Sequence, residues 1–318
     1  MAIDPTALTI AFKRGQLDAM VRTHLGSGGM YTAEMQRTFA LRQLARAWKT
    51  YREDRAISMG ARLVGSECAA ERDAFLALLL QTLPSRNSPL RDAVHTVRRI
   101  AIAPLAAEAR QSVEIADASI AQLDAVTTTL DSGLLPTDPL ERLLSLVNHH
   151  RYSIGDERDA LGATALSPCW AINLLALTRP EAFGLCKAPP PFPGIVRRRL
   201  FRADLAPDAQ RNSARENLLD VMHAAIGDMD SIWRAARRFS VEFPQQRSNS
   251  RLGNAWMLLA GLNELTPSQL ARALPATKAG AGKLLRQLAA HHLVRSNGLY
   301  EPFSWNPVSA AAFAHDLS

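Results

Sequence analysis

The stretch TPSQLARALPATKAGAGKLLRQLAAHHLVRSNGLY, residues 266–300, decides the fold that we predict for the C-terminal part of the chain. Thr266 followed by Pro267 predicts the start of a short helix, because threonine caps helices well and proline is tolerated at the first helical position. Pro275 ends that helix, since the residue before a proline is disfavoured in the α region. Thr277 then begins a second helix, so we expect two short helices joined by a few residues.

The second of these helices has one apolar and one basic face. Its apolar stripe is Ala281, Leu284, Leu285 and Leu288, and the other face carries Lys278, Gly282, Lys283, Arg286 and Gln287. Beyond it, Asn297-Gly298 lies between apolar residues and predicts a hairpin with a type I′ turn. With a further helix at about residues 250–263 (Leu252, Ala255, Trp256, Leu259 and Leu262 on one stripe), this order is typical of a winged helix-turn-helix.

In such a domain the second helix enters the major groove of double-stranded DNA. We expect Lys278, Lys283 and Arg286 to contact phosphates or guanine edges, because cations at exposed helix positions recognise both. The other predicted DNA contacts are Gln287 with a base or phosphate, Thr277 with a phosphate at the helix N-terminus, and Arg295 with the backbone beside the wing. The leading prediction is a DNA-binding transcriptional regulator. The alternative is a non-enzymatic scaffold whose winged helix and long helix bind protein partners.

A resemblance to a known family follows from the same residues. The run Arg247-Ser248-Asn249-Ser250-Arg251-Leu252, the apolar helix after it and LTPSQLARALPATKAGAGKLLRQLAAHHLV resemble the C-terminal part of a rhizobial-type alphaproteobacterial family of unknown function. The resemblance covers about residues 210–300 and implies an all-helical N-terminal region joined to a C-terminal helix-turn-helix. Similar winged helices end some Fic-domain proteins, but the sequence has no HPFxxGNGR run, so adenylylation is not implied. The wing in this family is usually rich in arginine, whereas here Arg295 is its one arginine.

The charge is placed unevenly along the chain. The net charge is +7, with 21 basic and 20 acidic residues over residues 1–191 and 16 basic and 10 acidic residues over residues 192–318. An excess of positive charge confined to one part of a protein favours a polyanionic partner such as DNA.

The sequence also argues against several classes of protein. Cys68, Cys169 and Cys186 lie far apart, as free thiols do in a reducing cytosol. There is no apolar run long enough to cross a membrane and no signal peptide, so we expect a cytoplasmic protein without a membrane partner. Neither a nucleophile elbow, nor a phosphate loop, nor a dinucleotide or metal motif is present, so we expect no enzyme, no cofactor and no metal ion. An enzyme whose site is assembled from distant residues is a third alternative.

The N-terminal half shows helical periodicity throughout and no alternation of period two. In the helix expected from Thr32 to about Tyr51, the cations Arg42, Arg46 and Lys49 fall opposite the apolar stripe, so we expect them to face solvent. The fold class predicted is mainly α: an N-terminal helical bundle or array plus a C-terminal winged helix-turn-helix with a small β-hairpin wing. The predicted domains are 1–187 (all-helical), 188–209 (proline-rich linker and basic segment), 210–248 (long connecting helix) and 249–318 (winged helix-turn-helix).

Two further features lie near the middle of the chain. Arg197, Arg198 and Arg199 form a basic patch that either meets phosphates or pairs with nearby acids. In the long helix, a heptad seam runs through Leu218, Met222, Ala225, Met229, Ile232, Ala236 and Phe239. Its partner is either the same helix of a second chain, in a homodimer, or a helix of the N-terminal bundle. No residue pattern identifies a small-molecule effector.

Overall fold

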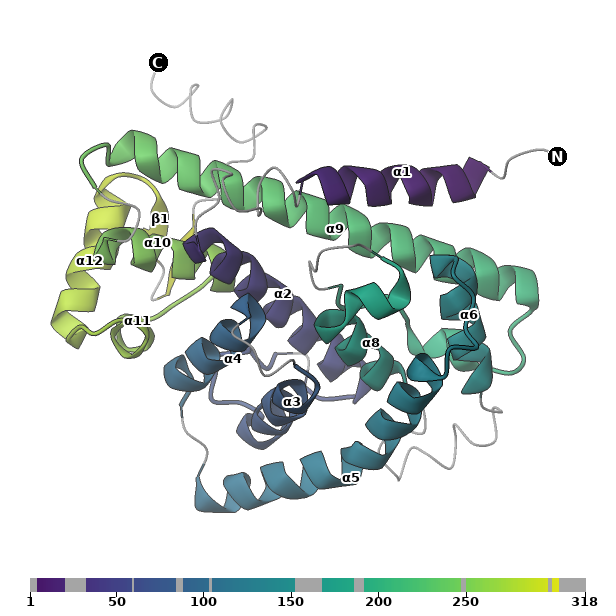
Figure 1. Ribbon diagram of the computed structural model, residues 1–318. Coiled ribbons are helices and arrows are strands. Elements are labelled where there is room, and N and C mark those ends of the chain that lie inside the picture. The colour runs from purple at the N-terminus through teal and green to yellow at the C-terminus, as the bar shows by residue number, and fades with distance from the viewer. Residues whose placement is uncertain are drawn as a thin grey trace. The chain divides into compact units, whose positions relative to one another are not determined.

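The structure, a computed structural model, describes residues 5–20, 33–58, 60–83, 88–102, 105–151, 168–185, 192–246, 250–296 and 299–302. Within these residues it contains eleven α-helices and one two-stranded antiparallel sheet (Figure 1). The α-helices are α1 (Pro5–Met20), α2 (Ala33–Asp54), α3 (Ala69–Thr82), α4 (Pro89–Ile100), α5 (Ala106–Asp131), α6 (Pro139–His149), α8 (Cys169–Thr178), α9 (Pro207–Glu242), α10 (Arg251–Leu262), α11 (Pro267–Ala273) and α12 (Lys278–Ala290). The short 3₁₀ helices are η2 (Pro180–Phe183) and η3 (Arg198–Phe201), and the strands are β1 (Val294–Ser296) and β2 (Tyr300–Pro302). The prediction of a mainly α protein is confirmed.

The chain divides into two compact units, which we call unit 1 (Met1–Trp233) and unit 2 (Arg234–Ser318). The division falls inside α9, so this helix contributes residues to both units. The four-part division predicted from the sequence stays a prediction.

The core of unit 1 is built around α2, which packs against α3, α4 and α8, while α5 packs along α3 (Figure 1). Trp48, Tyr51, Phe75 and Trp170 meet in this core, with ring centroids 4.9–5.9 Å apart. Each aromatic side chain buries a large apolar area, so this cluster is a main contributor to the hydrophobic stabilisation of unit 1.

Local capping rules account for several helix starts in unit 1. The side chain of Ser88 accepts a hydrogen bond from the Arg91 amide at 3.2 Å and caps α4. The side chain of Asp138 accepts hydrogen bonds from the amides of Leu140 and Glu141, both at 3.0 Å, and caps α6. In both helices proline follows the cap, as the sequence predicts.

Two parts of unit 1 add to what the sequence indicates. All ten residues of α8 are buried, and this helix was not predicted, because a helix that is apolar on every side shows no periodic face. Residues 188–209 were predicted as a linker and basic segment. Residues 188–191 lie outside the described residues, whereas the segment after them packs into the core of unit 1 through Phe192, Ile195, Val196, Leu200 and Phe201.

The expectation that Arg42, Arg46 and Lys49 face solvent is wrong for Arg42, whose side chain is 14% exposed, whereas Arg46 is 46% exposed but also contacts a buried carboxylate. Arg46 Nε donates to the Asp228 carboxylate at 2.6 Å, and Arg42 Nη1 lies 3.4 Å from the same carboxylate. Gln43 donates to it as well, at 2.8 Å. The side chain of Asp228, on α9, is only 6% exposed. These residues of α2 therefore supply the hydrogen bonds that a buried carboxylate needs, a contact between distant residues that helical periodicity cannot reveal.

The heptad seam of α9 lies inside the chain. Its residues proposed for a dimer are between 0% and 6% exposed: Leu218, Met222, Met229, Ile232 and Phe239. A homodimer through this seam would first require these side chains to leave their buried positions. Which of the two predicted partners the seam has, a second chain or a helix of the N-terminal bundle, stays a prediction.

Unit 2 has its core on α10. The apolar stripe predicted for this helix is buried, and Trp256 Nε1 donates a hydrogen bond to the Ala235 carbonyl at 2.8 Å. In the sheet, β1 and β2 pair antiparallel with Ser296 opposite Tyr300. This register leaves three residues, 297–299, between the last pair, one more than a two-residue turn. The predicted Asn297-Gly298 turn itself lies outside the described residues.

Candidate nucleic-acid interface

The helix start at Thr277 positions the basic side chains of α12. Thr277 has extended backbone angles, and its hydroxyl accepts a hydrogen bond from the Gly280 amide at 3.1 Å, so it is the N-cap. The preceding helix α11 has its own cap at Thr266, in a reciprocal pair with Gln269. Residues 274–277 join the two helices. Both helix starts lie where the sequence predicts them.

One side of α12 is buried and the other is exposed. Ala281, Leu285 and Leu288 are completely buried and hold the helix on unit 2. The residues predicted to contact DNA are all exposed: Thr277, Lys278, Lys283, Arg286 and Gln287 on or beside α12, and Arg295 on β1. Within the described residues, Lys278, Lys283 and Arg286 form no ion pair with a carboxylate. Their charges are therefore available to an external anion.

Contacts at its C-terminal end tie α12 to the end of α9. Arg238 Nη2 donates to the His292 carbonyl at 2.8 Å, and the His291 ring lies 4.3 Å from that of Phe243, centroid to centroid. His291 Nδ1 is also 3.5 Å from the Glu242 carboxylate. These contacts restrict how α12 moves on its own unit. The sequence pattern did not indicate them, because they join residues about 50 positions apart.

A backbone bridge adds a third segment to the sheet. The amide of Leu265 donates to the Tyr300 carbonyl at 3.1 Å, and the amide of Tyr300 donates to the Leu265 carbonyl at 3.2 Å. Leu265 lies between α10 and α11, so the bridge joins the start of the two-helix segment to β2. Sequence reasoning missed it, since a single-residue bridge has no alternating pattern.

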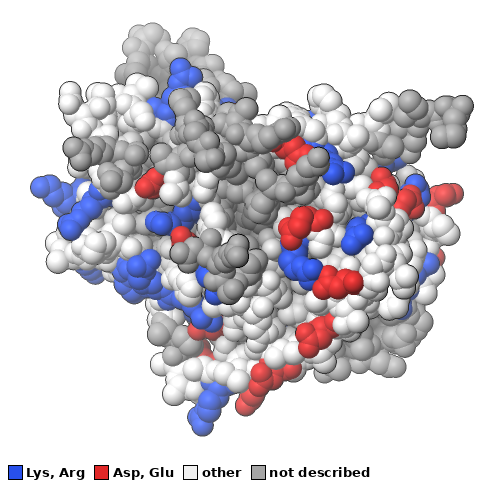
Figure 2. Space-filling view, in the orientation of Figure 1, with Lys and Arg blue, Asp and Glu red and all other residues white. Residues whose placement is uncertain are grey.

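The positive charge of the protein is concentrated in unit 2. Residues 234–318 contain 10 Lys and Arg against 4 Asp and Glu, whereas residues 1–233 contain 27 against 26. Unit 2 therefore carries +6 of the net +7. Figure 2 shows Lys and Arg side chains projecting from the edge that α12 forms in Figure 1. A concentration of this kind raises the local potential and attracts polyanions.

The arginine patch predicted at residues 197–199 is partly neutralised. Arg197 lies 3.8 Å from the Asp220 carboxylate, and the neighbouring Arg202 lies 2.7 Å from that of Asp204. Arg198 is half-buried. Pairing with acids, one of the two alternatives, thus accounts for part of the patch, and contact with phosphates stays a prediction.

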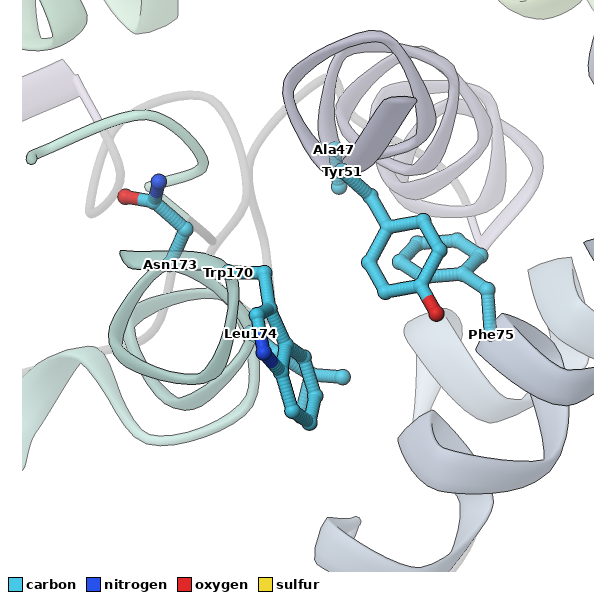
Figure 3. Close-up of a pocket in the computed structure, with 6 residues that line it drawn as sticks. All are labelled: Ala47, Tyr51, Phe75, Trp170, Asn173 and Leu174. Atoms are coloured by element: carbon cyan, nitrogen blue, oxygen red, sulfur yellow. The ribbon is translucent and has the colours of Figure 1, made fainter. Parts of the chain in front are cut away.

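A small cavity in unit 1 is lined by Ala47, Tyr51, Phe75, Trp170, Asn173 and Leu174 (Figure 3). Its volume is about 10 Å³, close to the minimum for one water molecule. Pockets for substrates and effectors are usually about 300–1,000 Å³, so this cavity holds neither. In the described part of the chain, no group of three or more His, Cys, Asp or Glu side chains is arranged to hold a metal ion.

Comparisons of the chain with protein-family models, with curated proteins and with solved structures found no match. Among the helices that the structure describes, none combines the length and the apolar character needed to cross a membrane.

Proposed function

We propose that unit 2 contains a winged helix-turn-helix that binds double-stranded DNA, with α12 in the major groove. The observation that carries the proposal is the exposed face of α12, where Lys278, Lys283 and Arg286 have no carboxylate partner among the described residues. Cations that are not needed for the fold, on a helix that is fixed by its apolar side, suit contact with phosphates and base edges.

The order of elements supports the winged-helix part of the proposal. Along the chain α10 is followed by the Leu265 bridge segment, α11, α12, β1 and β2. In a winged helix-turn-helix the first helix supports the other two, and the hairpin lies beside the helix that enters the groove. The family resemblance over about residues 210–300 implies the same arrangement and stays part of the proposal.

The arrangement of polar groups supports specific roles on DNA. Thr277 and the first amides of α12 form a helix N-terminus, which favours a phosphate. Arg286 and Gln287 lie one helical turn or more further along, where their longer side chains would meet base edges. Arg295, on β1, would contact the DNA backbone beside the wing.

Fluorescence anisotropy of the full chain on labelled duplex DNA at about 50 and 200 mM salt tests the proposal. We expect binding that weakens steeply between the two salt concentrations, because phosphate contacts release counterions. A variant with Lys278→Ala, Lys283→Ala and Arg286→Ala should bind much more weakly. Its salt dependence should also fall, by about one unit of slope for each phosphate contact removed.

A charge-matched variant separates the α12 surface from net charge. Arg98, Arg99 and Arg110 are exposed cations of unit 1 that form no carboxylate pair in the described part of the chain. Replacing all three by alanine removes the same charge and should leave DNA binding nearly intact. If both triple variants lose binding equally, or if the wild type does not bind at low salt, the proposed interface is wrong and a protein partner becomes the next hypothesis.

A transcriptional regulator must also prefer some DNA sequences over others. Competition between labelled and unlabelled fragments of different sequence, at about 200 mM salt, measures this preference because the non-specific contribution is then small. Equal competition by all fragments would restrict the proposal to non-specific DNA binding.

A further inference from the structure

A buried polar cluster in unit 1 joins α2, α8 and the segment before η3. The Asp54 carboxylate, at the end of α2, accepts hydrogen bonds from the Cys169 thiol at 3.2 Å and from the Asn173 amide nitrogen at 3.1 Å. All three side chains are buried. The cluster lies in unit 1 and includes no residue of the candidate interface, so the inference drawn from it does not rest on DNA binding.

Asn173 also binds the backbone of Val196, in the segment before η3. Its amide nitrogen donates to the Val196 carbonyl at 3.0 Å, and its amide oxygen accepts from the Val196 amide at 3.1 Å. In Figure 3 this side chain points away from the aromatic rings that line the cavity, toward the other side of α8. Asn173 thereby holds the backbone of Val196 beside Cys169 and Asp54.

Two oxygen atoms lie within hydrogen-bond distance of the Cys169 thiol. Its sulfur lies 3.2 Å from Asp54 Oδ1 and 3.5 Å from the Val196 carbonyl oxygen, and each oxygen is positioned to accept its proton. A thiol has a single proton to donate. Burial raises the pKa of Cys169, so this proton stays on the sulfur, and of the acceptors that the structure describes either Asp54 Oδ1 or the Val196 carbonyl can take the hydrogen bond.

The protonation of Asp54 decides that choice. An ionised carboxylate can only accept, so it takes the thiol proton. A protonated carboxyl can donate its own O–H to the sulfur, which leaves the thiol proton for the Val196 carbonyl. In both protonation states of Asp54, every O–H or S–H of Asp54 and Cys169 has an acceptor. The two states differ by one proton, which comes from solvent.

We propose that Asp54, Cys169 and the Val196 carbonyl form a proton-linked hydrogen-bond switch, in which protonation of Asp54 transfers the thiol's hydrogen bond from the carboxylate to the backbone of the segment before η3. Charged groups from each neighbouring element bear on the switch. Arg198 on η3 attracts the carboxylate, and Glu53 on α2 repels it. Protonation also ends the attraction between Asp54 and Arg198, which belongs to the predicted arginine patch.

The switch operates near neutral pH. Burial is the largest influence on Asp54 and raises its pKa to about 7, against opposing hydrogen bonds from Cys169 and Asn173. Because the folded pKa lies above the unfolded one, the folded state binds the extra proton. The resulting stabilisation is complete below the unfolded pKa and is lost as the pH rises through 7.

Infrared spectroscopy of the full chain from about pH 5 to 9 tests the exchange, because the S–H stretch depends on the oxygen that accepts the proton. The difference between wild type and Cys169→Ala identifies the Cys169 band. We expect this band to shift with a midpoint near pH 7, together with loss of the protonated carboxyl band of Asp54. In Asp54→Asn, a neutral side chain of the same shape, the S–H band should not change with pH.

The Cys169→Ala variant gives a second, independent outcome. The thiol stabilises the charged carboxylate, so its removal should raise the pKa of Asp54 further. The switch is refuted if the carboxyl band titrates near pH 4 like an exposed aspartate, or if Asp54 titrates while the S–H band stays fixed. An unchanged or lower pKa of Asp54 in Cys169→Ala would equally overturn it. If Asp54→Asn fails to fold, the titrations of Cys169→Ala and of the wild type still test the switch.

Discussion

Arg142 and Arg151 of unit 1 and the cations of α12 in unit 2 are used in opposite ways. In unit 1, Arg142 Nε donates to the Ala182 carbonyl at 2.5 Å, and Arg151 Nη2 donates to the Leu205 carbonyl at 2.8 Å. On α12 the cations are exposed and have no carboxylate partner among the described residues. Hydrogen bonding within the chain therefore distinguishes them: half-buried guanidinium groups that donate to backbone carbonyls hold segments of the fold together, whereas exposed cations contribute little to stability and can serve a partner.

Arg72 should show the largest effect on stability. It is 1% exposed, donates to the Gly65 carbonyl at 2.6 Å and the Ile102 carbonyl at 3.0 Å, and lies beside Asp73. Arg72→Ala removes these donors and leaves a cavity where a completely buried side chain was, so we expect the free energy of unfolding to fall by about 3–5 kcal/mol. Urea denaturation followed by circular dichroism measures this. The exposed Arg99→Ala should change it by under about 0.5 kcal/mol, and similar losses in both variants would remove the distinction between buried and exposed arginines.

Asp228 should show the next largest effect. Asp228→Ala leaves Arg42, which is 14% exposed, and the buried Gln43 without their acceptor. We expect a loss of about 2–4 kcal/mol in the free energy of unfolding, because removing one member of a buried ion pair is costly. Asp220, on the same helix, is a matched control: its side chain is 67% exposed and lies 3.8 Å from Arg197. Asp220→Ala should cost at most about 0.5 kcal/mol, and an equal cost for the two would contradict a structural role for the α2 arginines.

Replacing the cations of α12 should change stability little and DNA binding strongly. For the triple variant Lys278→Ala, Lys283→Ala, Arg286→Ala we expect the free energy of unfolding to change by less than about 1 kcal/mol, since exposed substitutions have small effects. DNA binding should weaken by about 2–3 kcal/mol, roughly 30- to 150-fold, at low salt. Both quantities are measured on the same preparation. A large loss of stability would mean that the lost binding reports unfolding of unit 2 rather than the contacts of α12.

Much of the secondary structure could be predicted from the sequence because its signals are local. The structure begins a helix after each of four predicted capping residues, three of which are followed by proline: Thr266, Thr277, Ser88 and Asp138. The buried stripe of α10 was predictable for a related reason, since residues three and four apart lie on one face of a helix.

The features that the sequence did not predict depend on contacts between residues far apart in the chain. The role of Arg42 and Arg46 follows from Asp228, more than 180 positions away, and nothing in the spacing on α2 indicates it. The Asp54 cluster joins residues 115 or more positions apart in the same way. On the candidate interface, the sequence predicted the exposed charged side chains of α12 but not the bridge between Leu265 and Tyr300, because a single pair of residues has no period.

The two glycines of α12 provide the smallest and most selective change. A Cβ on Gly282 would meet no atom within 4 Å, whereas one on Gly280 would lie 3.3 Å from the Thr277 hydroxyl that caps the helix. Glycine inside a helix costs about 1 kcal/mol relative to alanine. Gly282→Ala should therefore raise the free energy of unfolding by about 0.5–1 kcal/mol, and Gly280→Ala should gain less, because its Cβ disturbs the cap.

DNA binding by Gly282→Ala then tests why glycine is found among the cations of this face. If α12 lies in the groove with its backbone close to the DNA, the added methyl group weakens binding although the protein is more stable. Stability and binding would move in opposite directions, which a purely structural role for α12 does not produce. Tighter or unchanged binding in anisotropy would mean that the backbone at Gly282 stays away from the DNA, and the contact would then rest on the long side chains of Lys278, Lys283 and Arg286 alone.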